Sequence, residues 1–264
     1  MHGPVLHQGQ TPTSRIWLFA GTEEGPQLAE TLLARGWWLL VSVVSGAAGR
    51  AYPVHPRLEL MVGAINSDQH LQQELAQRQP RWVVDATHPF AQVISERLDR
   101  VCGNTGVEVL RLERQLPAQG APGEQLHWLE STDALRALPL RGVRLLLAIG
   151  ARQLPAAIAA SAEAEHYARV LDQPGSLQAA RAAGLSDARI ACLRPDPMGT
   201  GALEEALCRR WRIELVLCRQ GGGRSERIWR QVCRRRSLPL LLLQRPREAT
   251  GLPLPQLLEK LGQP

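Results

Sequence analysis

Apolar positions along this chain fall into two alternating patterns. Short β-branched or aliphatic runs, at residues 15–20, 37–44 and 82–84, are typical of buried strands. Stretches such as 92–101 space their apolar residues as one face of a helix. This alternation, with short loops, predicts parallel sheets covered by helices. By the same criteria we expect strands at 57–62, 107–112, 143–149, 167–171, 189–193, 214–218 and 238–243, and helices at 26–35, 68–77, 132–138, 154–160, 177–183, 203–211 and 225–236.

The pattern occurs twice. In each half a strand ends at a glycine, and a polar strand end follows 64 to 68 positions later, Gly21 to Asp85 and Gly150 to Cys218. We therefore expect an α/β protein of two Rossmann-like halves, each a mostly parallel sheet covered by helices, with a cleft between them. The predicted divisions are an N-terminal tail, 1–14, a dinucleotide-binding half, 15–118, and a C-terminal half, 141–247.

Composition places the chain among cytoplasmic globular proteins. Of 264 residues 44% are apolar and 21% charged, and no apolar stretch approaches the ~20 residues that cross a bilayer. Residues 1–14 are polar and lack the apolar core of an export signal. The five cysteines are odd in number and form no C-x-x-C pair. They are therefore expected to be small buried residues in a reducing compartment, with no metal site.

Positive charge is concentrated near the C-terminus. Residues 1–190 hold 17 basic and 18 acidic side chains, whereas 191–264 hold 14 and 7, and Lys260 is the only lysine. Arginine forks suit carboxylates and phosphates, so this region indicates a polyanionic small molecule or a nucleic acid. With two Phe and two Tyr, stacking platforms for nucleic acid are missing, which favours the small molecule. A solvated basic helix face is the structural alternative.

The first strand is followed by a candidate phosphate site at residues 21–26, Gly-Thr-Glu-Glu-Gly-Pro. Glycines permit close approach of a ligand to the backbone, and exposed amides at a helix start favour phosphate. The segment does not match G-x-G-x-x-G, so a plain strand-to-helix turn is the alternative. The dinucleotide would be held by Gly21, Thr22, Glu23, Glu24 and Gly25.

The second strand ends in Ser45, Gly46 and, four positions on, Arg50. NAD-binding folds usually place an acid here for the ribose hydroxyls, whereas an arginine accommodates a 2′-phosphate. Because no acid is present, NADPH is favoured over NADH, and these three residues are predicted to contact it. The alternative for Arg50 is a surface loop charge.

Residues 85–91, Asp-Ala-Thr-His-Pro-Phe-Ala, join a buried strand to a helix. Ligands bind at such carboxyl ends of strands in open α/β sheets. In an ordinary loop, Asp85 would cap a turn, Thr87 would cap the helix and Pro89 would lie near its first turn. His88 could donate a proton, since imidazole titrates near neutrality, or it could hold the turn by a hydrogen bond.

These motifs resemble those of the precorrin-6A reductases of cobalamin biosynthesis. The resemblance spans almost the whole chain, and residues 85–91 are its most specific part. The family commonly has serine-lysine-x-serine-glycine where this chain has 218–222, Cys-Arg-Gln-Gly-Gly, which keeps a charge at Arg219 and lacks both hydroxyls. Further matching segments are residues 21–24 (Gly-Thr-Glu-Glu), 109–114 (Val-Leu-Arg-Leu-Glu-Arg), 149–153 (Ile-Gly-Ala-Arg-Gln) and 169–174 (Arg-Val-Leu-Asp-Gln-Pro).

The resemblance implies reduction of one double bond of a polycarboxylate macrocycle, precorrin-6A or its cobalt form, with hydride from NADPH or NADH. Thr87, Pro89 and Phe90 would then contact the cofactor, with His88 as the candidate catalytic acid. Arg152, Arg219, Gly221 and Gly222 would bind substrate carboxylates. A non-catalytic nucleotide- or tetrapyrrole-binding protein is the competing hypothesis. No nucleic-acid or membrane partner is expected, and the sequence does not fix the oligomeric state, for which we expect a monomer.

Overall fold

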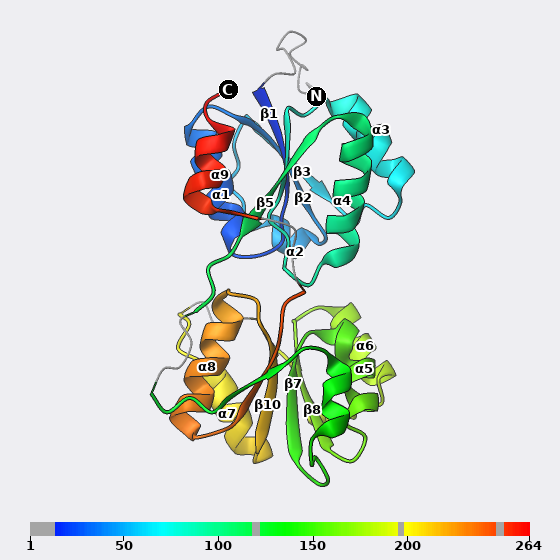
Figure 1. Cartoon of the computed structure of the whole chain (residues 1–264), viewed down its shortest axis with the longest axis vertical. Coiled ribbons are helices and arrows are strands. Elements are labelled where there is room, and N and C mark those ends of the chain that lie inside the picture. Colours follow the sequence, from blue (N-terminus) through cyan, green and yellow to red (C-terminus); the bar gives the residue numbers. More distant parts are fainter. Residues whose placement is uncertain (1–13, 118–121, 195–197, 247–250) are drawn as a thin grey trace, which may run out of the picture. The chain divides into compact units, whose positions relative to one another are not determined.

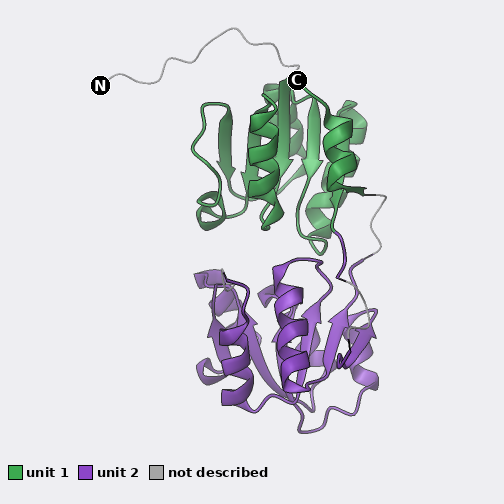
Figure 2. Ribbon diagram, turned by 90° about the vertical axis from the view of Figure 1, so that its left-hand side faces the viewer, with its two compact units in different colours: residues 1–114, 247–264 green, residues 115–246 purple. Residues whose placement is uncertain are grey.

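The computed structural model describes residues 14–117, 122–194, 198–246 and 251–264. The chain forms two compact units (Figure 2). Unit 1 comprises Met1–Arg114 and Arg247–Pro264, and unit 2 comprises Gln115–Pro246. These bounds differ from the predicted halves, because the segment between the halves belongs to unit 2 and the C-terminal segment returns to unit 1. The predicted tail lies, apart from Ser14, outside the described residues.

Unit 1 contains one six-stranded parallel sheet, in the order β12-β5-β4-β1-β2-β3. Its strands are β1 (Arg15–Phe19), β2 (Trp38–Val43), β3 (Leu58–Val62), β4 (Trp82–Asp85), β5 (Glu108–Glu113) and β12 (Leu252–Pro253). Its helices are α1 (Glu24–Ala34), α2 (Gly46–Gly49), α3 (Asp68–Arg78), α4 (Gln92–Thr105) and α9 (Leu254–Leu261). Figure 1 shows α1 and α9 on one side of this sheet and α3 and α4 on the other.

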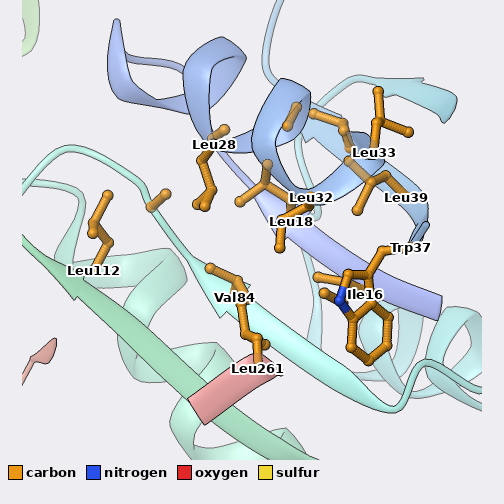
Figure 3. Packing of buried hydrophobic residues seen from close by; sticks show 14 of the residues in the cluster. Ile16, Leu18, Leu28, Leu32, Leu33, Trp37, Leu39, Val84, Leu112 and Leu261 are labelled. Atoms are coloured by element: carbon orange, nitrogen blue, oxygen red, sulfur yellow. The ribbon is translucent and has the colours of Figure 1, made fainter. Parts of the chain in front are cut away.

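The side chains of β1 alternate between two apolar cores, as the two-residue period of a strand requires. Ile16 and Leu18 pack with α1 and α9, and Trp17 and Phe19 pack with residues of α3 and α4. Figure 3 shows the first core, where Leu28 of α1 lies above the sheet and Leu261 comes from the C-terminal helix. A strand buried on both faces reads as a continuous apolar run, so β1 was predictable from sequence.

Unit 2 contains a second six-stranded parallel sheet, in the order β6-β11-β10-β7-β8-β9. Its strands are β6 (Leu126–Leu129), β7 (Arg144–Ala148), β8 (Glu165–Val170), β9 (Ile190–Cys192), β10 (Leu215–Arg219) and β11 (Leu240–Leu243). Its α-helices are α5 (Leu154–Ala160), α6 (Pro174–Ala182), α7 (Ala202–Trp211) and α8 (Arg224–Arg236), with 3-10 turns at Thr132–Ala137, Ala151–Gln153 and Asp187–Arg189.

The two sheets have the same topology. Strands β7 to β11 occupy in unit 2 the places of β1 to β5 in unit 1. The sixth place, beside β5 or β11, is filled by β12 in one sheet and by β6 in the other. The predicted internal repeat is therefore confirmed, and both sheets have the Rossmann-like parallel arrangement expected from the sequence.

The C-terminal segment is a part of unit 1 that the sequence analysis missed. Leu257 and Leu261 of α9 are buried in the first core, and Leu254 is 42% exposed. Trp37 Nε1 donates to the carbonyl of Gly262 over 3.3 Å, and Lys260 pairs with Glu108. Since these contacts join residues about 150 to 225 positions apart, local patterns in the sequence do not predict them.

The cysteines are all free thiols, and four of them are buried as predicted. Cys192 is only partly buried. Burial raises the pKa of the Cys102 thiol to about 11 and that of Cys218 to about 12, so these thiols are protonated at neutral pH. In the described part of the chain, no helix has both the length and the apolar composition to cross a bilayer.

Candidate active site

In unit 1 the direction of chain progression across the sheet reverses between β1 and β4. The chain runs from β1 through β2 to β3 on one side, and through β4 to β5 on the other. Phe19 at the end of β1 pairs with Asp85 at the end of β4, so the two following turns are neighbours. Such a reversal is where open α/β sheets bind ligands, outside the carboxyl ends of the strands.

The turn after β1 offers open backbone. Gly21 is exposed, and apart from its two chain neighbours no described residue has an atom within 4 Å of the position that a β-carbon would occupy there. Helix α1 begins three residues later, so its first-turn amides and its dipole lie at this edge of the sheet. Gly25 is different, because a β-carbon there would overlap the buried Tyr52 hydroxyl and Ala20. Its role in the structure is therefore packing inside unit 1.

Arg114, directly after β5, connects the two turns. Its Nη2 donates to Thr22 Oγ1 over 2.6 Å and to the Thr87 carbonyl over 3.1 Å, and it lies 3.4 Å from Glu24 Oε2. Thr22 Oγ1 donates in turn to the carbonyl of Ala86 over 3.4 Å. The Thr22 hydroxyl is therefore engaged within the protein, and it ties the turn after β1 to the residues that follow β4 and β5.

Asp85 organises the turn after β4. Its Oδ1 accepts from the Thr87 amide at 3.0 Å and the Thr87 hydroxyl at 2.7 Å, and its Oδ2 accepts from Ser95 Oγ at 2.6 Å. Arg111 Nε lies 3.3 Å from Oδ2, and the carboxylate is 2% exposed. The buried carboxylate therefore has hydrogen-bond donors on both of its oxygens, which fixes the shape of the turn.

The expectation that Thr87 caps the following helix is wrong. Helix α4 begins at Gln92, its N-cap is Ala91, and no side chain caps it. The Thr87 hydroxyl bonds Asp85 because that acceptor lies two residues away in the turn, an arrangement that competes with capping. Asp85 does cap a turn, as predicted, and Pro89 lies in the turn before the helix.

His88 bonds within the same turn. Its Nδ1 accepts from the Phe90 amide over 3.2 Å, and the two rings are 5.7 Å apart at their centroids. An imidazole that accepts at Nδ1 carries its proton on Nε2. Pro89, between them, is buried. The turn is thus shaped by its own side chains.

At the end of β2, Ser45 caps the short helix α2 by accepting from the Ala48 amide over 3.3 Å. Gly46 is exposed, with no atom within 4 Å of a β-carbon position. Arg50 is exposed and has no salt bridge to any described residue. Val44 is 64% exposed beside them. This strand end therefore combines an apolar side chain, open backbone and a cation.

The equivalent edge of unit 2 is closed by its own side chains. Arg219, at the end of β10, packs its guanidinium against Gly150, 3.3 Å from a β-carbon position there, and burial lowers its pKa. Gly222 donates its amide to Glu226 Oε2 over 2.8 Å. Arg152, after β7, is exposed. An anion reaching this edge would meet arginine side chains rather than open amides.

Comparison with known proteins agrees with this arrangement. Residues 15–261 match the model of the precorrin-6x reductase family, described as precorrin-6x reductase CbiJ/CobK. The chain belongs to that family. It is therefore a reductase of the corrin-precursor type, as the motifs predicted.

Individual relatives of this reductase match over most of their length. The cobalt-precorrin-6A reductase of Synechocystis sp. is 33% identical over 238 residues, which cover 89% of this chain and 90% of that protein. The precorrin-6A reductase of Rhodobacter capsulatus is 30% identical over 234 residues, 88% of each. A solved structure titled CobK precorrin-6A reductase has a TM-score of 0.76 and 27% identity, covering 95% of this chain and 98% of that one.

The fold of this reductase brings together two of the three groups of residues predicted for the cofactor. The turn after β1 and the turn after β4 meet at the reversal point, and Ser45, Gly46 and Arg50 lie one strand further along, after β2. The sequence analysis missed Arg111, Ser95 and, above all, Arg114 as residues that support these turns. A signal for Arg114 existed, because it follows directly on the strand beside β4 and so had to lie at the same edge.

Proposed function

We propose that this reductase uses NADPH to reduce one carbon–carbon double bond of precorrin-6A or its cobalt form, yielding the 6B form. The proposal rests on one observation in a chain of this family. The turn after β1, where Gly21 is open, lies beside the turn after β4, whose shape is held by its own side chains. This pairing lies at the reversal point of unit 1, where dinucleotides bind in sheets of this order.

The strand ends of unit 1 fit a dinucleotide. Gly21 leaves room for a pyrophosphate against the backbone near the start of α1. The exposed Val44 offers an apolar surface for the adenine, beside Ser45. Thr87 and Phe90 then lie toward the nicotinamide, because β4 is on the other side of β1 from β2. The nicotinamide, when bound, supplies the hydride.

Preference for NADPH over NADH rests on Arg50. Its guanidinium is exposed after β2, no acid occupies residues 44–50, and a 2′-phosphate would give it a partner. A charge-assisted hydrogen bond is worth roughly 1.5–3 kcal/mol, which corresponds to about ten- to a hundredfold in affinity. We expect Arg50→Ala to bring the two dissociation constants close together.

Arginine side chains of unit 2 are proposed to bind the substrate carboxylates. Arg219 is the last residue of β10 and Arg152 follows β7, and these strands are neighbours in the sheet, so both arginines lie at its carboxyl edge. The Gly222 amide is already bonded to Glu226, so the glycines after β10 contribute a tight turn more than an anion site. The arginine-rich composition of this region provides the charge for a polycarboxylate.

The test is turnover. Purified protein is mixed with precorrin-6A or with cobalt-precorrin-6A and with NADPH or NADH, and nicotinamide absorbance is followed. Oxidation that depends on one of the macrocycles supports the proposal and identifies the natural ring. Nucleotide binding without oxidation in any of the four mixtures would instead support a non-catalytic binding protein, and separate titrations of both nucleotides, followed by fluorescence, measure the cofactor preference.

A further inference from the structure

Arg114 is a buried cation at the carboxyl edge of unit 1, directly after β5. Its side chain is 5% exposed, although it lies among turns that are open to solvent. A buried guanidinium is retained only where hydrogen bonds and an opposite charge compensate the loss of hydration. Both are present, since Nη2 bonds to Thr22 and Thr87 and the Glu24 carboxylate lies 3.4 Å away.

The two hydrogens on Nη2 are divided between two different turns. One goes to the Thr22 hydroxyl, after β1, and the other to the Thr87 carbonyl, after β4. Glu24 Oε2 is buried and has no hydrogen-bond partner among the described residues, so Glu24 supplies charge compensation rather than a third bond. The guanidinium thus acts as a tie between the two turns.

We propose that Arg114 is a positioning residue of the cofactor site, which fixes the turn after β1 against the turn after β4 through Thr22 and Thr87. The inference rests on the proposed function, because it assigns both turns to NADPH. A side chain this buried has little surface to offer a ligand, so Arg114 acts through its partners. Fixing both turns before binding removes the entropy cost of ordering them when the dinucleotide arrives.

The experiment measures the NADPH dissociation constant by fluorescence in the whole protein, with thermal melting of each variant. Arg114→Met should weaken NADPH binding about tenfold or more. Arg114→Lys should lie between, because an ammonium keeps the charge and lacks the planar fork that spans two acceptors. Arg78→Met is the control, since Arg78 pairs with Glu59 and Glu74 at the amino-terminal edge of the same sheet. It should bind NADPH as the wild type does.

A double-mutant cycle separates positioning from general destabilisation. If Arg114 acts through Thr22, then Thr22→Val should cost much less affinity in the Arg114→Lys background than in the wild type. Thr22→Ser, which keeps the hydroxyl, should bind as the wild type does. These three variants also carry the test if Arg114→Met fails to fold.

The inference is overturned if the folded Arg114 variants, or Thr22→Val, bind NADPH as tightly as the wild type. It is equally overturned if the losses from Thr22→Val and Arg114→Lys add in full. A wild type that binds neither nucleotide would refute the proposed function itself, so the two failures are distinguishable.

Discussion

Units 1 and 2 share one strand order and differ in what fills the carboxyl edge. After β1, Gly21 has open space around it, whereas after β7 the equivalent Gly150 is covered by the guanidinium of Arg219. After β10 the Gly222 amide is occupied by the chain's own Glu226 carboxylate. The same topology therefore presents free backbone in one unit and arginine side chains in the other.

This difference shows that topology locates a site without deciding its chemistry. Open amides and glycine suit a phosphate that approaches the main chain, while guanidinium groups suit peripheral carboxylates. The proposed function needs both kinds of recognition, phosphate for the cofactor and carboxylate for the substrate. Variants that change the glycine turn of unit 1 or the arginines of unit 2 should therefore affect cofactor binding and substrate binding separately.

The largest effect, on the free energy of unfolding, is expected from helix α9, which packs in the core of unit 1. Leu257→Ala should lower the free energy of unfolding by about 2–5 kcal/mol, because it leaves a cavity in the first core. Leu254→Ala, at a position 42% exposed on the same helix, should cost far less. Denaturant unfolding of both variants measures the difference, and equal losses would contradict the burial of Leu257 in the first core.

Next in size is the contrast between the two strand-end glycines. Gly21→Ala should weaken NADPH binding about ten- to a hundredfold, because a methyl group would occupy the space next to the backbone. Gly150→Ala is the comparison variant in unit 2, since φ is positive at both positions and backbone strain on the order of 1 kcal/mol is expected at each. At Gly150 the new methyl group would also contact the Arg219 guanidinium. Equal losses of NADPH affinity in the two variants would mean that unit 1 is not the cofactor unit.

A smaller effect is expected at the arginine edge of unit 2. Arg219→Ala should raise KM for the macrocycle by roughly tenfold, through loss of a charged hydrogen bond, and leave the NADPH dissociation constant unchanged. Arg210→Ala, an exposed arginine in the last turn of α7, serves as the control for net charge. Steady-state kinetics measure KM for the macrocycle, and a fluorescence titration measures the NADPH dissociation constant. An unchanged KM in Arg219→Ala would remove Arg219 from the substrate site.

The smallest effect concerns His88, whose Nδ1 holds the Phe90 amide. If the imidazole shapes the turn, His88→Ala should weaken NADPH binding a few-fold with a modest change in kcat. His88→Asn should restore binding, because its amide oxygen can accept the same bond. A loss of about 10²–10⁴ in kcat in both variants, with NADPH affinity kept, would instead identify His88 as the proton donor.

Local sequence patterns were sufficient for the elements buried on both faces. The strands around Trp17 and Leu217 are continuous apolar runs, and α8 shows its inward residues Ile228, Trp229 and Val232 at helical spacing. The edge strand β6 was missed because only Leu129 of its four residues is buried, so its apolar pattern is weak. Helix α9 has leucines at helical spacing, but its packing against unit 1 depends on contacts between residues far apart in the sequence.

The candidate site divides in the same way. Gly21 and residues 85–91 follow strands whose adjacency the Rossmann-like prediction already implied. The contacts of Arg114 could not be predicted, since its bond to Thr22 spans 92 positions. The role of Thr87 could not be predicted either, although it is local. Its hydroxyl can cap the following helix or bond Asp85, and the sequence does not show which of the two forms.

The sixth strand of unit 1 has a consequence for synthesis on the ribosome. Unit 2 is one uninterrupted stretch of chain, whereas unit 1 takes β12 and α9 from residues 251–264, which follow unit 2 in the sequence. Domains fold as units while the chain emerges, so unit 2 can complete its core before unit 1 does. The nascent protein would therefore expose the apolar face that awaits Leu257 and Leu261 until these two residues have been synthesised.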